Sequence, residues 1–109
     1  MFYKCYSLKS ADLSSFNSTN VNNIRGMFNF CSSLESANLS SLNTTNVKNM
    51  RSLFAGCSSL KSLDLSSFDT TNVNKINYMF DRCSSLKKEN VKINKNGGKI
   101  MEAIKKYLE

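Results

Sequence analysis

The sequence contains no histidine, no tryptophan and no proline, and it has only four glycines among 109 residues. Histidine is the most frequent general base in enzymes, so its absence argues against an acid–base active site. The absence of proline suits a chain whose segments are joined by many backbone hydrogen bonds. No apolar run reaches the roughly 18 residues of a membrane-spanning helix, and residues 1–5 have no signal-peptide core. We therefore expect neither a membrane span nor an enzymatic role.

Negative charge is also scarce, because 8 Asp and Glu stand against 15 Lys and Arg, for a net charge of +7. The excess is concentrated near the C-terminus, where the lysines are Lys87, Lys88, Lys92, Lys95, Lys99, Lys105 and Lys106. Such an end can meet an acidic partner, a nucleic acid or an anionic surface. It can also simply keep this end of the chain soluble. We favour this second role, so binding of nucleic acid is the weaker hypothesis.

The four cysteines reveal an internal repeat. They are spaced 26 residues apart, at Cys5, Cys31, Cys57 and Cys83. Alignment on them brings a leucine into register three residues later, at Leu8, Leu34, Leu60 and Leu86. A second apolar column follows eight residues after each cysteine, at Leu13, Leu39, Leu65 and Val91, and a third at Phe16, Leu42 and Phe68. A fixed period of this length indicates stacked repeats rather than a globule.

Each repeat combines two kinds of periodicity. The spacing of Leu60, Leu63, Leu65 and Phe68 is the leucine-rich-repeat strand pattern, a short parallel strand with alternate residues inward. The apolar positions of 73–80 recur at three- and four-residue intervals, which predicts a two-turn helix. We therefore expect an α/β fold: a right-handed leucine-rich-repeat solenoid of 26-residue coils. Short parallel strands would line one face and short helices the other.

The two ends depart from the repeat. Residues 1–94 are predicted to form the solenoid, with coils starting near Cys5, Cys31, Cys57 and Cys83, and residues 95–109 a C-terminal capping helix. In the fourth coil Glu89 would take the place of Leu63, and Asn94 the place of Phe68. The capping helix, from about Lys99, would bury one face, made of Ile100, Met101, Ile104 and Leu108.

The N-terminal coil has no equivalent cap, because Met1 and Phe2 fill the positions of Met27 and Phe28. An uncapped coil exposes apolar side chains and unpaired backbone groups, which favours self-association. The sequence thus predicts either the tail of a longer array or a homodimer through the N-terminal coil.

The unit from Cys57 to Phe80, CSSLKSLDLSSFDTTNVNKINYMF, closely resembles the BspA-type leucine-rich repeats of bacterial surface proteins. The resemblance covers residues 1–94 and rests on the combination of the CSSL, DLSSF, TNV and MF elements. It implies a repeat array displayed at the cell surface or secreted, used in adhesion to host or neighbouring-cell molecules. It implies no particular set of ligand-binding residues.

The candidate chemical groups favour structural roles. The four cysteines lack the close spacing of a zinc site, so we expect buried reduced thiols, with disulfides between neighbouring coils as the alternative.

Asp12 and Asp64 share one strand position and would lie roughly 10 Å apart, slightly too far for the carboxylate pair of an inverting glycosidase. Sequons begin at Asn17, Asn38 and Asn43, but Asp69 shares the position of Asn17 and Asn43, which favours turn formation. We expect no cofactor and no metal.

The outward positions of the strands form the best candidate surface for a partner. Their small polar and charged side chains are Lys9, Asp12, Ser14, Glu35, Asn38, Ser40, Lys61, Asp64 and Ser66, and the rows would continue through Lys87, Asn90 and Lys92. The first hypothesis is a non-enzymatic interaction or adhesion module that binds a protein or cell-surface ligand through this face. The alternative is a passive spacer or self-assembling segment that pairs through its N-terminal coil.

Overall fold

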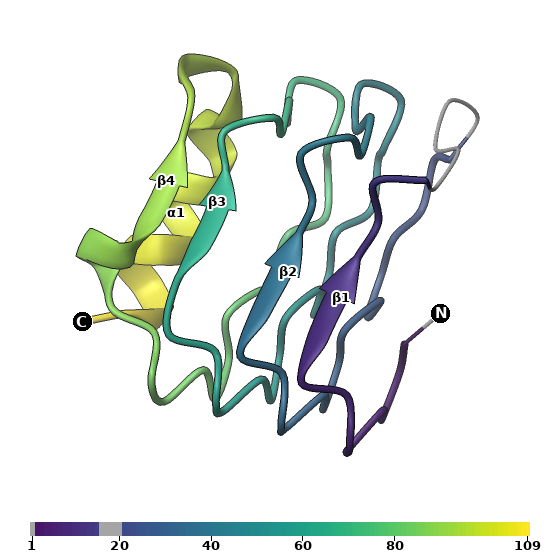
Figure 1. Ribbon diagram of the computed structural model, residues 1–109. Helices are drawn as coiled ribbons and strands as arrows, with labels where there is room; N and C mark the ends of the chain where they lie inside the picture. The colour runs from purple at the N-terminus through teal and green to yellow at the C-terminus, as the bar shows by residue number, and fades with distance from the viewer. Residues whose placement is uncertain (1, 16–20) are drawn as a thin grey trace.

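The computed structural model describes residues 2–15 and 21–109 (Figure 1). Four three-residue strands follow one another along the chain: β1 Ser10–Asp12, β2 Ser36–Asn38, β3 Leu63–Leu65 and β4 Val91–Ile93. A 3-10 helix, η1 Lys88–Asn90, precedes β4, and a second one, η2 Lys95–Gly97, leads into α1, Gly98–Tyr107. The strands lie side by side on one face, and α1 lies at the C-terminal end (Figure 1). The expectations for Met1, Phe16 and Asn17 concern residues outside the described part.

The strands pair in two parallel sheets rather than one. β1 pairs with β2 so that Ser10 lies opposite Ser36, and β3 pairs with β4. Within the described residues no strand ladder joins β2 to β3. The polar face is therefore interrupted at its centre.

The register of β4 corrects the sequence prediction by two residues. Val91 lies opposite Leu63, where Glu89 was expected, and Ile93 takes the position opposite Leu65 that was assigned to Val91. Residues 88–90 are wound into η1, where the N–H of Asn90 donates to the carbonyl of Lys87. This turn takes up two extra residues and leaves the Glu89 carboxylate exposed rather than inward. Beyond β4, the side-chain amide of Asn94 donates to the carbonyl of Ser66, and the N–H of Thr70 donates to the carbonyl of Asn96, one full period later.

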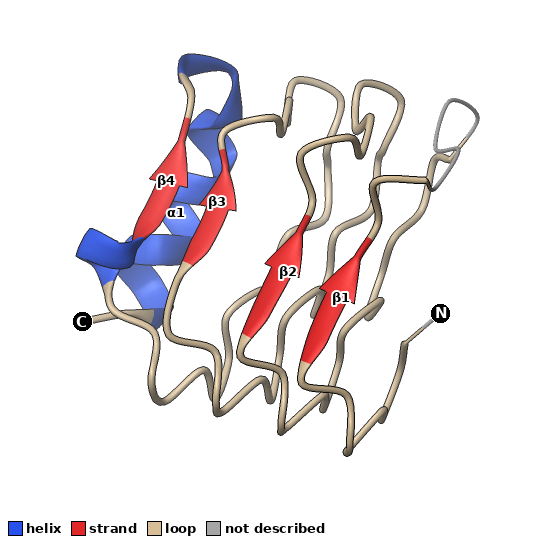
Figure 2. Ribbon diagram, viewed as in Figure 1, coloured by secondary structure: helices blue, strands red, loops and turns tan. Residues whose placement is uncertain are grey.

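The return segments between strands are not helical, contrary to the prediction for 73–80 (Figure 2). Alternate backbone N–H groups of these segments donate to the next repeat: Ile24 donates to Asn49 at 3.0 Å, and Met50 to Lys75 at 2.7 Å. The N–H groups between them, such as that of Met27, donate to a carbonyl of their own segment. A helix needs those same N–H groups for its internal bonds. One residue per segment also has a left-handed backbone, with φ of 63° at Gly26, 58° at Ser52 and 63° at Tyr78. Left-handed residues end a right-handed helix.

A second left-handed residue precedes each cysteine. The φ values are 57° at Lys4, 61° at Phe30, 80° at Gly56 and 62° at Arg82. Gly56 is the only glycine of this set, and the ring of Phe30 lies against it, so that a Cβ at Gly56 would approach Phe30 Cδ1 to 2.5 Å. Neighbouring repeats are in close contact at this turn.

The core is built from columns of equivalent side chains. Phe2, Phe28, Phe54 and Phe80 stack with centroids 5.2, 5.6 and 6.1 Å apart and rings within 4° of parallel. The leucines three residues after the buried cysteines, Leu34, Leu60 and Leu86, are buried as well. Each repeat therefore buries its apolar side chains against its neighbours rather than within itself.

Helix α1 closes the last repeat with Ile100, Ala103, Ile104 and the adjacent Leu108, all buried. Met101, which the sequence placed on the same face, is 40% exposed. Successive helical residues are about 100° apart, and the buried face is centred near Ile100 and Ile104, so Met101 lies at its margin. Within 2–15 and 21–109, no helix is long and apolar enough to cross a membrane.

Candidate partner-binding face

All nine residues proposed from the sequence are exposed on the strand side of the molecule. Asp12 of β1 lies opposite Asn38 of β2. In the fourth repeat the row continues with Lys92, which lies opposite Asp64, and not with Asn90 as predicted. Lys9, Glu35 and Lys61 precede their strands and are exposed.

The central row is engaged in turns at the strand ends. The Oδ1 atom of Asp12 accepts from the N–H of Ser14 at 2.9 Å. Asp64 accepts from the N–H of Ser66 at 3.0 Å and from its hydroxyl at 2.5 Å. Asn38 accepts in the same way from Ser40. The repeated Asx-Leu-Ser sequence thus ends each strand, a structural role typical of Asx turns.

These turns also fix the charge of the face. The backbone N–H of Ser14 is the main cause that lowers the pKa of Asp12, and the Ser66 hydroxyl is the main cause that lowers that of Asp64. Both carboxylates are therefore ionised at neutral pH. The amide of Asn38 donates to Asp12 Oδ1 at 3.4 Å and links the first two repeats.

A cleft of about 270 Å³ opens where β2 and β3 are not paired. Four of the nine proposed residues line it: Asn38, Ser40, Asp64 and Ser66. Ala37, Leu39 and Ser67 also line it, and the Ser67 hydroxyl donates to the Leu39 carbonyl at 3.1 Å. Lys9, Asp12, Ser14, Glu35 and Lys61 do not line the cleft.

The cysteines are free thiols held away from this face. Cys31, Cys57 and Cys83 are buried, and each Sγ donates to the carbonyl of Phe2, Phe28 or Phe54 in the preceding repeat, at 2.8 to 3.0 Å. Burial raises the pKa of all three, that of Cys83 to about 12. A protonated, buried thiol is a poor nucleophile and a poor metal ligand. Among the described residues, no three His, Cys, Asp or Glu are grouped to hold a metal ion.

Sequence reasoning overlooked several exposed aromatic side chains away from the strands. Tyr3, Tyr6 and Tyr78 are 53%, 56% and 44% exposed. The signal was present in the alignment, because the equivalent repeat positions hold small or polar residues such as Ser52 and Ser84. An aromatic residue in such an outward position is not needed by the core.

A profile of the family described as "Mycoplasma protein of unknown function, DUF285" matches residues 1–107. No curated protein and no solved structure matches the chain.

Proposed function

We propose that this chain, which belongs to the DUF285 family, is a non-enzymatic adhesion or protein-interaction module. Its polar strand face would bind a protein or cell-surface ligand. We further propose that the chain is a right-handed leucine-rich-repeat solenoid of the BspA type, displayed at the cell surface or secreted. The parallel pairing of Ser10 with Ser36 and the phenylalanine column support this fold.

The cleft between β2 and β3 is the single observation that carries the proposal. It combines four predicted residues with a stretch of strand that has no ladder partner on that side. Hydroxyl, amide and carboxylate groups around a small apolar wall suit a ligand that is recognised by hydrogen bonds. The absence of histidine and the engagement of Asp12 and Asp64 in their own turns favour binding over catalysis.

The test compares binding of the labelled full chain to an array of matrix proteins and cell-surface glycans. Ser40→Lys with Ser66→Lys fills the cleft with two long side chains and should weaken binding about tenfold or more. Ser7→Lys with Ser84→Lys adds the same charge at exposed turn positions and should leave binding nearly unchanged. Equal binding by both double variants would refute a role for the strand face.

A passive spacer that pairs through its N-terminal coil is the second candidate. Phe2 is the first ring of the aromatic column within the described residues; it stacks on Phe28 and is only partly buried. Stacking of two such ends would extend the column between two chains. Sedimentation over a wide concentration range should then show a dimer that is lost in Phe2→Asp. A monomer at every concentration excludes this candidate.

A further inference from the structure

The return segments form a parallel hydrogen-bonded ladder that runs towards the C-terminus. In the second repeat every other N–H donates to the third, at 2.7 to 3.0 Å, from Met50, Ser52, Phe54 and Gly56 to the carbonyls of Lys75, Asn77, Met79 and Asp81. The first repeat donates to the second in the same way, from Ile24, Gly26, Phe28 and Phe30. Each segment thus presents donors that the next one satisfies.

The third repeat presents the same donors to α1, which satisfies them incompletely. The N–H of Tyr78 donates to the hydroxyl of Tyr107 at 3.1 Å, so this side chain replaces a carbonyl of the missing repeat. Ile76 holds the position of Ile24 and Met50, whose N–H groups are both bonded. Across 2–15 and 21–109, no hydrogen bond is donated by the N–H of Ile76, nor by those of Phe80 and Arg82, which hold the positions of Phe54 and Gly56. The ladder therefore stops at the third repeat, where three of its four donors have no acceptor among the described residues, and that of Ile76 belongs to the segment beside the helix.

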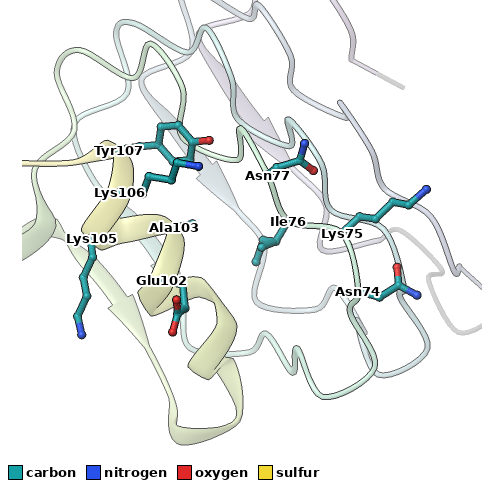
Figure 3. Close-up of a pocket in the computed structure, with 9 residues that line it drawn as sticks. All are labelled: Asn74, Lys75, Ile76, Asn77, Glu102, Ala103, Lys105, Lys106 and Tyr107. Atoms are coloured by element: carbon teal, nitrogen blue, oxygen red, sulfur yellow. The ribbon is translucent and has the colours of Figure 1, made fainter.

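A groove of about 560 Å³ lies at this point, between residues 74–77 and the second half of α1 (Figure 3). Ile76, partly buried, lies on one wall, and Ala103 and Tyr107 of α1 lie on the other (Figure 3).

The groove is lined by more positive than negative side chains, which favours an acidic partner. Lys75, Lys105 and Lys106 line it, against one carboxylate, Glu102. A positive groove favours a segment that carries Asp or Glu. A second copy of this chain fits poorly. The carbonyls that it could offer to this groove belong to its first return segment and its N-terminal residues, and those segments carry the positively charged side chains of Arg25 and Lys4.

We propose that this groove binds an extended acidic peptide segment of a partner protein, which lies alongside residues 74–77. A peptide carbonyl accepts from the N–H of Ile76, an apolar side chain packs between Ile76 and Ala103, and acidic side chains meet the three lysines. The backbone bond at Ile76 and the apolar contact contribute affinity, and the acidic side chains contribute specificity. The groove is separate from the cleft between β2 and β3, so this inference does not depend on the proposed function.

The test is a fluorescence anisotropy titration of the full chain with a labelled octapeptide of alternating aspartate and valine. Binding should be at least about tenfold weaker for the peptide with lysine in place of aspartate, and for the variant Lys105→Glu with Lys106→Glu. The matched control, Lys87→Glu with Lys88→Glu, makes the same charge change near the same end but outside the groove. It should alter affinity by less than about twofold, and Ser40→Lys with Ser66→Lys should not alter it.

Amide exchange provides a second readout that general charge attraction would not produce. Saturating peptide should slow exchange of the Ile76 N–H, which gains an acceptor, while the N–H of Met50, already bonded, should be unchanged. Equal loss of affinity in both lysine variants would indicate a diffuse polyanion surface and overturn the proposal. Unchanged exchange at Ile76, or concentration-dependent self-association that competes with the peptide, would overturn it as well.

Discussion

At the scale of single residues, the buried cysteines combine two roles that no other side chain of their size provides. Cys57 is fully buried, and its thiol donates to the carbonyl of Phe28 at 3.0 Å. Alanine would leave this carbonyl without its thiol partner, and serine would introduce a more strongly hydrated hydroxyl. The column of buried cysteines therefore joins adjacent repeats both by packing and by hydrogen bonding.

The first prediction concerns alkaline pH. The pKa of Cys83 is raised from 9.0 to about 12 in the fold, so the folded state keeps a proton that the unfolded state releases. Stability is then full below pH 9 and falls as pH rises from there towards 12, by at most about 1.4 kcal/mol per pH unit for each such thiol. Urea unfolding across this range measures the slope. Cys83→Ala should be less stable at neutral pH but have a shallower slope, and parallel curves would contradict the assignment.

The second prediction concerns the turns at the strand ends. Asp64→Ala removes the acceptor of the Ser66 N–H and should destabilise the fold by about 1 kcal/mol. Asp64→Asn keeps an acceptor, as Asn38 does in the neighbouring repeat, and should lie within about 0.5 kcal/mol of the parent. Both are measured by urea unfolding at neutral pH. An equal loss in the two variants would mean that charge, rather than the turn, is important here.

At the scale of elements, the return segments depend on backbone shapes that the local sequence disfavours. Phe30, Ser52 and Tyr78 all adopt positive φ without being glycine. Such residues are strained by roughly 1–2 kcal/mol each relative to a right-handed conformation. The inter-repeat hydrogen bonds that Phe30 and Ser52 themselves donate hold these conformations in place.

The third prediction tests this close packing. Gly56→Ala places a Cβ 2.5 Å from Phe30 Cδ1 and 3.1 Å from Phe30 Cα, at a φ of 80°. We expect a loss of about 1–3 kcal/mol in the free energy of unfolding. Gly98→Ala is the matched control, because its Cβ meets nothing within 4 Å. A thermal melt in which the two variants coincide would show that the turn adjusts without strain.

At the scale of the whole molecule, stability depends on closing the last repeat, because a single repeat buries too little by itself. Helix α1 supplies that closure through Ile100 and Ile104, and its Tyr107 supplies one acceptor for the ladder. The helix is amphipathic, with Lys105 and Lys106 exposed. It covers the apolar end and leaves the groove beside Ile76.

The fourth prediction separates the covering face of α1 from its margin. Ile104→Asp buries a carboxylate at a position that is 4% exposed, and should destabilise the chain by at least about 3 kcal/mol or prevent folding. Met101→Asp lies on the same helix but is 40% exposed, and should change stability by less than about 1 kcal/mol. Circular dichroism and sedimentation distinguish folded monomer from unfolded or aggregated chain. Similar behaviour of the two variants would contradict the capping role.

Much of the candidate face could be predicted from spacing alone. The exposure of Asp12, Asn38 and Asp64 followed from their position between inward residues, because strand side chains alternate. The cleft among Asn38, Ser40, Asp64 and Ser66 could not be predicted, since it arises from the missing ladder between β2 and β3. The groove beside Ile76 was missed for a related reason, because it depends on where a helix outside the repeat comes to lie.

The sequence by itself determined which side chains become neighbours, because residues one period apart, such as Phe28 and Phe54, occupy equivalent places in successive turns of the chain. The hydrogen-bond partners of the backbone and the register of β4 became visible in the three-dimensional structure alone. The N–H groups of Ile24, Gly26, Phe28 and Phe30 bond to the next repeat rather than forming a helix, and η1 shifts β4 by two residues so that Ile93 lies opposite Leu65. Such choices follow from competition between local and inter-repeat hydrogen bonds, and a periodic pattern of side chains does not encode which of the two is stronger.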